Sequence, residues 1–313
     1  MEDLLIVSAS PHIRHKRTTS RVMLDVILAL LPALGMAVYL FGPRALVLTV
    51  FCVTVCLALE YAFCLVVKKP STINDLSAVV TGILLAFNLP VSFPLWMAAI
   101  GCAAAIVVAK QLFGGLGENF ANPAIVGRVV LMVSFTAQMS NYTTPFLYQK
   151  TGQVVDAVTS ATPLAQLGSE QAPGYLDLFL GLHAGAMGEV CAAALLLGGL
   201  YLVLRRVISP LIPVCYIGTV FLLTTLCGAD GVYHILSGGL MLGAIFMATD
   251  YVTSPMTRLG KVIFAVGCGL ITAVIRLFGS YPEGVSFAIL LMNILTPTID
   301  RLVRTHPVGG VRG

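Results

Sequence analysis

Long apolar runs separated by short polar connections dominate this chain. A helix that crosses a bilayer needs about 20 apolar residues, and a half-helix buried inside protein needs fewer. By this measure the pattern predicts ten membrane-spanning helices, over residues 22–41, 45–67, 76–89, 94–112, 122–137, 187–204, 208–227, 233–249, 261–279 and 284–299. The predicted fold class is therefore an all-α polytopic membrane protein.

Several of these runs are short or broken. The third ends just before Pro90, the fifth begins at Asn122-Pro123, and the seventh contains Pro213. Interrupted helices are tolerated at membrane depth where the backbone lines a cavity or a bound group. We therefore expect the helix bundle to enclose such a site.

A polar segment divides the spans into two groups of five. The predicted organisation is a cytoplasmic N-terminal segment (1–21), a first five-helix half (22–137), an extracytoplasmic loop (138–186), a second five-helix half (187–299) and a cytoplasmic tail (300–313). Two halves of five helices have opposite topology, as in inverted-repeat transporters. The sequence similarity between the halves is faint, so inverted repeats and unrelated halves both stay open.

Composition excludes several classes of protein. Only 10% of residues are charged and 58% are hydrophobic, whereas a soluble domain is about one quarter charged. The net charge of +4, from dispersed basic residues, gives no support for binding nucleic acid. The eight cysteines lack the close pairing of metal sites, so we interpret them as small buried hydrophobic residues and expect no metal site.

The distribution of Lys and Arg predicts the orientation. With both termini in the cytoplasm, all but three of the 18 basic residues fall on the inside, as the positive-inside rule requires. The three exceptions are Arg44, Lys150 and Arg276. The segment 138–186 is thereby predicted to lie on the outer face.

Three acidic residues lie in or at the ends of predicted spans. Glu60 is within the second span, about 12 Å along the helix from Lys68, while Asp25 and Glu189 lie nearer membrane surfaces. A carboxylate inside a bundle is costly and often ligates an ion or relays a proton. All three are candidates for an ion pathway; the alternative is that each is paired with a basic residue.

Two other features have competing interpretations. Arg276 either pairs with Glu283, which we favour, or steadies an anionic flavin or phosphate. The glycine-rich stretch 114–117 either presents backbone N–H groups to a phosphate or forms a tight turn between two spans, and we favour the turn. No arrangement of catalytic residues typical of a hydrolase is recognised.

A hydroxyl-rich sequence lies in the outer loop, Asp156-Ala157-Val158-Thr159-Ser160-Ala161-Thr162. Ser and Thr cluster in surface turns for local hydrogen-bonding reasons, and by itself the sequence favours a turn. In a second interpretation, a threonine hydroxyl in this open loop is esterified by a phosphoryl group, with an acidic residue nearby to help position a metal. The spacing alone does not select a flavin.

The same loop and several other segments carry a resemblance. The other segments are Ser8–His12, Lys110–Ala124, Gly188–Glu189, Met247–Pro255 and Tyr281–Ala288. Together with the loop they resemble, in order and over almost the whole chain, the NqrB/RnfD family, whose members are membrane subunits of the Rnf complex and of the sodium-pumping NADH:quinone reductase. In that family the loop motif is an acidic residue, two variable positions and Ser/Thr-Gly-Ala-Thr.

The resemblance implies a covalent cofactor. Thr162 would bear FMN through a phosphoester, and the matching motif positions are Asp156, Thr159, Ser160 and Ala161. Ser160 stands where the family usually has Gly, so Thr159 and Ser160 are alternative acceptors. The family places this flavin on the outer face, as the charge distribution predicts for this loop. A second flavin, riboflavin, inside the bundle is a further implication.

The function implied is that of a membrane component of a redox-driven ion translocase, which couples ferredoxin:NAD electron transfer to Na⁺ or H⁺ translocation in a bacterial cell membrane. The expected partners are the iron–sulfur and flavin subunits of the Rnf complex and a flavin transferase for maturation, with no nucleic acid. Two alternatives stay open: a component like NqrB of the quinone reductase, and a solute channel or carrier without a redox cofactor.

Overall fold

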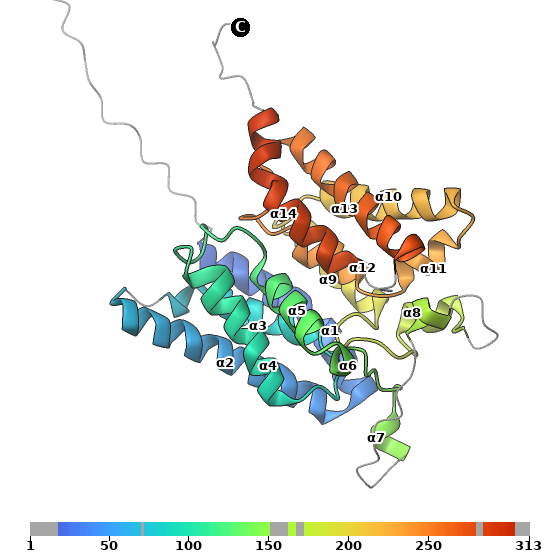
Figure 1. Ribbon diagram of the computed structural model, residues 1–313. Coiled ribbons are helices and arrows are strands. Elements are labelled where there is room, and N and C mark those ends of the chain that lie inside the picture. Colours follow the sequence, from blue (N-terminus) through green and yellow to red (C-terminus); the bar gives the residue numbers. More distant parts are fainter. Residues whose placement is uncertain (1–17, 70–71, 151–161, 167–171, 280–283, 304–313) are drawn as a thin grey trace, which may run out of the picture.

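The computed structural model describes residues 18–69, 72–150, 162–166, 172–279 and 284–303, and this part of the chain is built from helices. In the first half these are α1 (Thr19–Phe41), α2 (Pro43–Val67), the short 3₁₀ turn η1 (Ile73–Asp75), α3 (Ser77–Phe87), α4 (Leu95–Ala103) with its π-helical continuation η2 (Ala104–Gln111), and α5 (Pro123–Ser134). Figure 1 shows these blue-to-green helices gathered on one side of the molecule.

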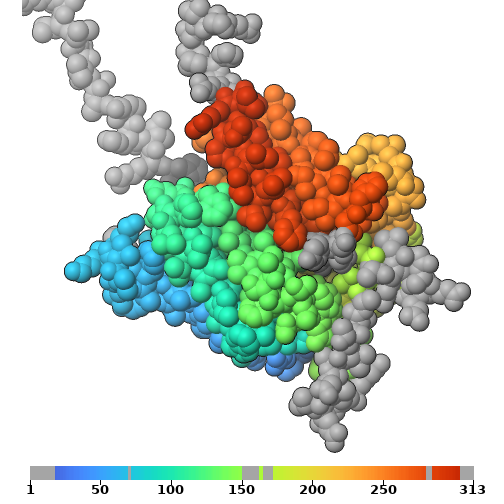
Figure 2. Space-filling view, in the orientation of Figure 1, coloured from blue at the N-terminus to red at the C-terminus, as the bar shows by residue number. Residues whose placement is uncertain are grey.

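The second half follows a connecting region of short helices. That region contains α6 (Thr136–Met139), α7 (Leu147–Lys150), the 3₁₀ turn η3 (Pro163–Gln166) and α8 (Tyr175–Leu180). The second half contains α9 (Ala192–Leu204), α10 (Leu211–Leu226), α11 (Gly231–Leu236), α12 (Leu240–Leu242), the π-helical η4 (Gly243–Met247), α13 (Arg258–Phe278) and α14 (Val285–Leu302). The space-filling view shows the surfaces of the two halves abutting (Figure 2).

The helical, polytopic class predicted from the apolar pattern is confirmed. Four described helices are long and apolar enough to cross a membrane, namely α1, α2, α13 and α14, and five shorter apolar helices accompany them: α3, α4 with η2, α5, α9 and α10. Nine of the predicted spans thus each contain one apolar helix. The remaining one, 233–249, is broken into α11, α12 and η4.

Among the spans that contain a single helix, the start of the sixth is the predicted boundary that departs furthest from the structure. The sixth span was expected to begin at residue 187, but α9 begins at Ala192. Residues 181–191 are not helical, although Ala186, Met187 and Val190 are buried. Apolar composition alone cannot distinguish such a buried irregular segment from a helix, because both avoid water.

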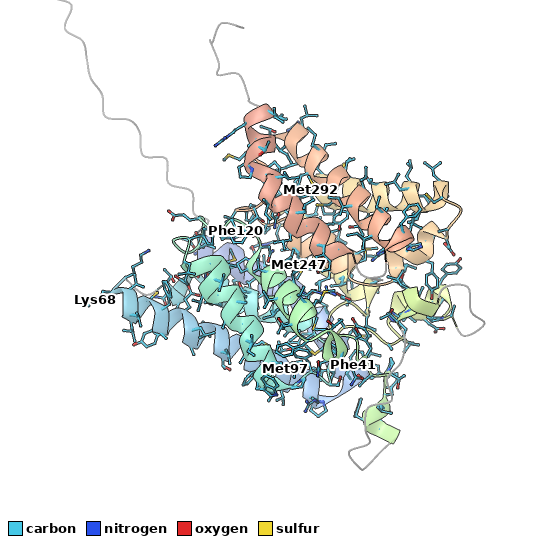
Figure 3. All side chains as sticks on the ribbon, in the orientation of Figure 1. Phe41, Lys68, Met97, Phe120, Met247 and Met292 are labelled. Carbon is cyan, nitrogen blue, oxygen red and sulfur yellow. The ribbon has the colours of Figure 1, made fainter. Side chains whose placement is uncertain are left out.

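Local signals explain how the fifth helix begins. The side chain of Asn122 accepts a hydrogen bond from the Ala124 backbone N–H (3.0 Å), and Pro123 occupies the first helical position. An Asn cap followed by proline is a favoured helix start, since proline lacks the N–H that would otherwise stay unsatisfied. Asn122 also donates to the carbonyl of Met247 (3.2 Å), which ties the start of α5 to η4. Met247 lies near the centre of the bundle (Figure 3).

Close helix packing joins the two halves. A Cβ atom on Gly198 of α9 would lie 2.1 Å from the Ala29 carbonyl oxygen of α1, so only glycine permits this approach. Small residues allow such contacts between membrane helices. Nearby, Gly188 N–H donates to the Phe87 carbonyl (2.9 Å) and Met187 N–H to the Leu89 carbonyl (3.1 Å). The non-helical segment 181–191 thus supplies hydrogen-bond donors to the backbone carbonyl groups at the end of α3.

Candidate cofactor site and buried ion pairs

Thr162, the predicted flavin attachment residue, is buried directly before η3, with 8% of its surface exposed. Its hydroxyl oxygen has no hydrogen-bond partner in the part of the chain that the structure describes. Buried polar atoms are nearly always hydrogen-bonded, so an orphaned hydroxyl calls for an explanation. A group attached to or seated against this oxygen is one such explanation.

The segment after Thr162 packs on α11. The Tyr233 hydroxyl donates to the Pro163 carbonyl (3.2 Å). The Asp230 carboxylate caps α11 by accepting from the backbone N–H groups of Val232 (3.0 Å) and Tyr233 (3.1 Å). The Tyr175 hydroxyl of α8 also donates to Asp230, and this hydrogen bond lowers the pKa of the Asp230 carboxyl. The Tyr233–Pro163 hydrogen bond thus joins the segment after Thr162 to α11, and the Asp230 contacts fix the start of α11.

Arg276 of α13 reaches the same region. Its guanidinium donates to the backbone carbonyls of His234 and Ser237 at the end of α11. A Cβ atom on Gly238 would lie 3.0 Å from Arg276 Nη2 and 3.1 Å from Leu164 Cδ1. The side chains of Arg276 and Leu164 therefore both lie next to Gly238. A cation therefore lies close to the segment that carries Thr162. Glu283, the partner expected from the sequence, lies outside the described residues.

The other positions of the loop motif, Asp156, Thr159, Ser160 and Ala161, also lie outside the described residues. Their predicted role stays a prediction. The structure describes the site from Thr162 onward, together with α11 and Arg276.

Glu60, the first ion-pathway candidate, is fully buried in an ion pair with Lys110 of η2. Both carboxylate oxygens lie 2.9 Å from Lys110 Nζ, and Gln111 Nε2 donates to Oε1 (3.1 Å). The Thr72 hydroxyl donates to the same oxygen, and Lys110 also donates to the Ser77 hydroxyl (2.6 Å). The carboxylate and the ammonium group are both saturated with hydrogen bonds, as a buried pair requires.

Lys110 was not predicted as the partner of Glu60. The sequence left the basic partner of Glu60 unnamed; Lys68, about 12 Å away along the same helix, is exposed at the end of α2. The signal that identifies Lys110 is a lone lysine inside an apolar run, which needs a buried counter-charge. The π-helical geometry of η2 is also typical of functional sites.

Glu189 forms a second buried ion pair, with Arg128 of α5. Arg128 Nη1 lies 2.5 Å from Glu189 Oε1 and also donates to the Asn88 side chain at the end of α3. Asn88 in turn donates to the Leu84 carbonyl (2.6 Å). This cluster connects α3 and α5 with the segment that leads into α9, so Glu189 lies between the two halves.

Asp25 is in a third, more exposed pair. Arg205 Nη2 lies 3.2 Å from Asp25 Oδ1, and the Tyr201 hydroxyl donates to the same oxygen (3.0 Å). The Arg205 side chain is 57% exposed, and exposed pairs contribute little stability. Asp25, Glu60 and Glu189 therefore lie in three separate ion pairs and do not form one cluster.

Lys110 and Arg128 are buried inside the bundle, with 2% exposure each. The charge distribution had counted both among the basic residues on the cytoplasmic side. Since the positive-inside rule concerns loop charges, they should not be counted in it. The three residues that break the rule are unchanged. Most of the remaining Lys and Arg residues therefore still support the predicted orientation.

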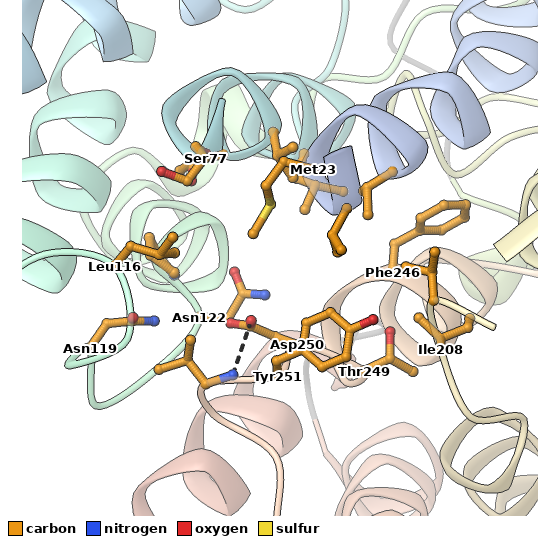
Figure 4. A pocket seen from close by; sticks show the side chains of 18 of the residues that line it. Met23, Ser77, Leu116, Asn119, Asn122, Ile208, Phe246, Thr249, Asp250 and Tyr251 are labelled. Atoms are coloured by element: carbon orange, nitrogen blue, oxygen red, sulfur yellow. Dashed lines mark hydrogen bonds between the residues drawn. The ribbon is translucent and has the colours of Figure 1, made fainter. Parts of the chain in front are cut away.

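A cavity lies between the two halves (Figure 4). It encloses about 80 Å³, and the polar side chains in its lining are those of Ser77, Thr81, Lys110, Asn119, Asn122, Thr249, Asp250 and Tyr251. Pockets for drug- or cofactor-sized ligands have roughly 300–1,000 Å³. In this conformation the cavity has room for a few water molecules and not for a flavin ring system. What the structure shows between the broken helices is a small cavity with a mostly apolar lining and a few polar side chains.

The glycine-rich stretch forms a tight turn beside this cavity. Gly114, Gly115 and Gly117 have φ angles of 129°, 110° and 101°, which favour glycine. Leu116 of the same turn lines the cavity. The favoured interpretation, a turn between two spans, is thus the conformation observed.

Known proteins resemble this chain over its whole length. The chain is 49% identical over 310 residues to the D subunit of the Na⁺-translocating ferredoxin:NAD⁺ oxidoreductase complex of Acetobacterium woodii, covering 97% of this chain and 95% of the relative. It is 43% identical over 325 residues to the D subunit of the proton-translocating ferredoxin:NAD⁺ oxidoreductase complex of Clostridium ljungdahlii, covering 98% and 96%.

A third relative, the D subunit of the ion-translocating oxidoreductase complex of Stutzerimonas stutzeri, is 38% identical over 329 residues, covering 94% of this chain and 93% of the relative. The sequence profile of the NQR2, RnfD, RnfE family matches residues 6–309, which include the helices of both halves and Thr162. The chain therefore belongs to the NQR2, RnfD, RnfE family.

Proposed function

We propose that this chain is the membrane component of a redox-driven ion translocase that couples ferredoxin:NAD electron transfer to Na⁺ or H⁺ translocation, and that Thr162 bears FMN through a phosphoester. The observation that carries the cofactor proposal is the buried hydroxyl of Thr162, which has no hydrogen-bond partner among the described residues. The names of the relatives support the coarser function, since each is the D subunit of an ion-translocating oxidoreductase complex.

The described residues fit such a group. Thr162 would supply the ester oxygen, and Arg276, which lies beside Gly238 as Leu164 does, would supply a positive charge for the phosphate. Tyr233 holds the adjacent backbone through the Pro163 carbonyl. When bound, FMN supplies one- and two-electron transfer, and the protein contributes its placement and electrostatic surroundings.

The assembly follows from the same proposal. The partners are the iron–sulfur and flavin subunits of the complex, with a flavin transferase for maturation. The chain spans a bacterial cell membrane with both termini in the cytoplasm and the Thr162 segment on the outer side. The orientation rests on the distribution of exposed Lys and Arg.

For the ion pathway we propose Glu60 as the principal candidate, because its carboxylate is buried and its partner Lys110 lines the cavity between the two halves. Glu189 and Asp25 are secondary candidates. The relatives do not select the ion, since the name of one specifies sodium and that of the other protons. Riboflavin as a second cofactor would require the cavity lining to move apart.

The decisive experiment is peptide mapping by mass spectrometry of the chain isolated from cells that contain the flavin transferase. We expect the peptide with Thr162 to carry the mass of one FMN less one water. A peptide of unmodified mass would remove the cofactor proposal and favour the carrier alternative. FMN on Thr159 or Ser160 would keep the cofactor but move the attachment residue.

We further predict that Arg276→Gln slows flavin attachment by about tenfold, because one charge-assisted hydrogen bond to the phosphate contributes about 1.5 kcal/mol. The measurement is in-gel fluorescence per chain at limiting transferase, and Arg276→Lys should recover part of the rate. The matched control is Arg44→Gln, because Arg44 also donates to a backbone carbonyl, that of Val91 (3.0 Å). Equal rates for both Gln variants would exclude a role for Arg276.

A further inference from the structure

An apolar groove lies between α9 and α10 on the surface of the second half, with a volume of about 630 Å³. Ile235 of α11 and Ile245 of η4 also line the groove. The remaining lining residues are Leu196, Gly199, Leu200, Val203, Ile208, Pro210, Pro213, Val214, Ile217, Gly218 and Phe221. No charged residue lines this groove.

A basic pocket adjoins one end of the groove. This second hollow, of about 520 Å³, shares Pro210 and Val214 with the groove and is also lined by Arg258 and Lys261 at the start of α13. No carboxylate forms an ion pair with Arg258 or Lys261 within the described residues. Two cations that have no ion-pair partner among the described residues thus lie at one end of an apolar groove.

The length of the groove matches one leaflet of a bilayer. Its residues extend along α10 from Pro210 to Phe221. At 1.5 Å per helical residue this distance is about 16 Å, and half of a hydrocarbon core is about 15 Å. The basic pocket lies where α10 and α13 begin, on the side that the charge distribution assigns to the cytoplasm.

We propose that the groove and the basic pocket together bind an anionic phospholipid. One acyl chain lies between α9 and α10, and the phosphate lies against Arg258 and Lys261. Basic pockets between membrane helices on the cytoplasmic side bind anionic headgroups. A hydrophobic helix of a partner protein would fill the groove but leave both cations without a counter-charge, so the lipid accounts for more of the observed features. The proposal does not depend on the proposed function.

The headgroup contact is tested with the full-length chain in mixed micelles that contain phosphatidylglycerol and phosphatidylcholine in equal amounts. Native mass spectrometry counts the retained lipids. We expect wild type to prefer phosphatidylglycerol, and Arg258→Gln with Lys261→Gln to lower that preference by about 25-fold, or about fivefold for each charge. The control is Arg301→Gln, an exposed cation at the end of α14 that lies outside the pocket.

The acyl-chain contact is tested by filling the groove. A Cβ on Gly218 meets no atom within 4 Å, so Gly218→Leu places a side chain in open space without strain. We expect it to reduce the retention of both lipids. Gly35→Leu is the matched control, since Gly35 of α1 is equally unobstructed and does not line the groove.

Three results would overturn the proposal. The first is an unchanged phosphatidylglycerol preference in the double charge variant. The second is unchanged lipid retention in Gly218→Leu. The third is a photo-crosslinker at Val214 that captures a partner helix in the intact complex and no lipid. Inorganic phosphate added alone should not displace the lipid; if it does so at millimolar concentration, the site binds free phosphate instead.

Discussion

Replacing Thr162 with alanine is expected to abolish the flavin fluorescence of the denatured chain and the corresponding mass increment. Alanine has no oxygen to form the ester. The substitution should not impair folding, because it removes a buried hydroxyl that has no partner among the described residues, and such a hydroxyl contributes no hydrogen bond to lose. The measurement is in-gel fluorescence under ultraviolet light, with intact mass as the second readout.

Thr162→Ser is the matched control for this substitution. Serine keeps the oxygen in the same position and should retain covalent flavin, although the lost methyl group slows attachment. Fluorescence that persists in Thr162→Ala would mean that another hydroxyl, such as that of Thr159 or Ser160, bears the flavin. Absence of fluorescence in wild type as well would contradict the cofactor proposal itself.

Breaking the buried pair of Glu60 and Lys110 is the second change with a large expected effect. Glu60→Gln leaves the Lys110 ammonium without its counter-charge at 2% exposure. Removing one partner of a buried ion pair destabilises a protein by about 3–5 kcal/mol. We expect a lower thermal midpoint for Glu60→Gln and for Lys110→Gln, measured by loss of soluble chain on heating in detergent.

The double variant separates stability from ion transport. Glu60→Gln with Lys110→Gln removes both charges, so its stability should return towards wild type. If Glu60 is in the ion pathway, ions transported per electron in proteoliposomes of the complete complex stay low in the double variant, while flavin attachment on Thr162 is intact. Recovery of ion transport together with stability would assign the pair a purely structural role.

Much of the fold follows from apolar run length, because a membrane helix must satisfy its own backbone. The apolar pattern locates nine apolar helices, including α3 and α5, which are each too short to cross a membrane by themselves. It fails at residues 187–191, where a buried irregular segment is as apolar as a helix. There the carbonyl groups of Phe87 and Leu89, about 100 residues earlier in the sequence, accept hydrogen bonds that local sequence does not reveal.

The ion pairs were less predictable than the helices. Lys110 is 50 residues from Glu60, and Arg128 is 61 residues from Glu189. Their pairing depends on which helices pack together, and this information is absent from hydrophobic periodicity. The proposed attachment residue, Thr162, rests on the resemblance of one loop, and its burial without a partner among the described residues is a separate structural observation.

The contacts between residues 187–189 and the first half bear on which class of membrane protein this is. A carrier that works by alternating access must rock one half against the other. Here that movement would break two buried backbone hydrogen bonds and separate Glu189 from Arg128. Each polar group left unpaired away from water costs several kcal/mol. A rigid scaffold of this kind suits electron transfer, because electrons tunnel between fixed cofactors and need no opening of the protein around them.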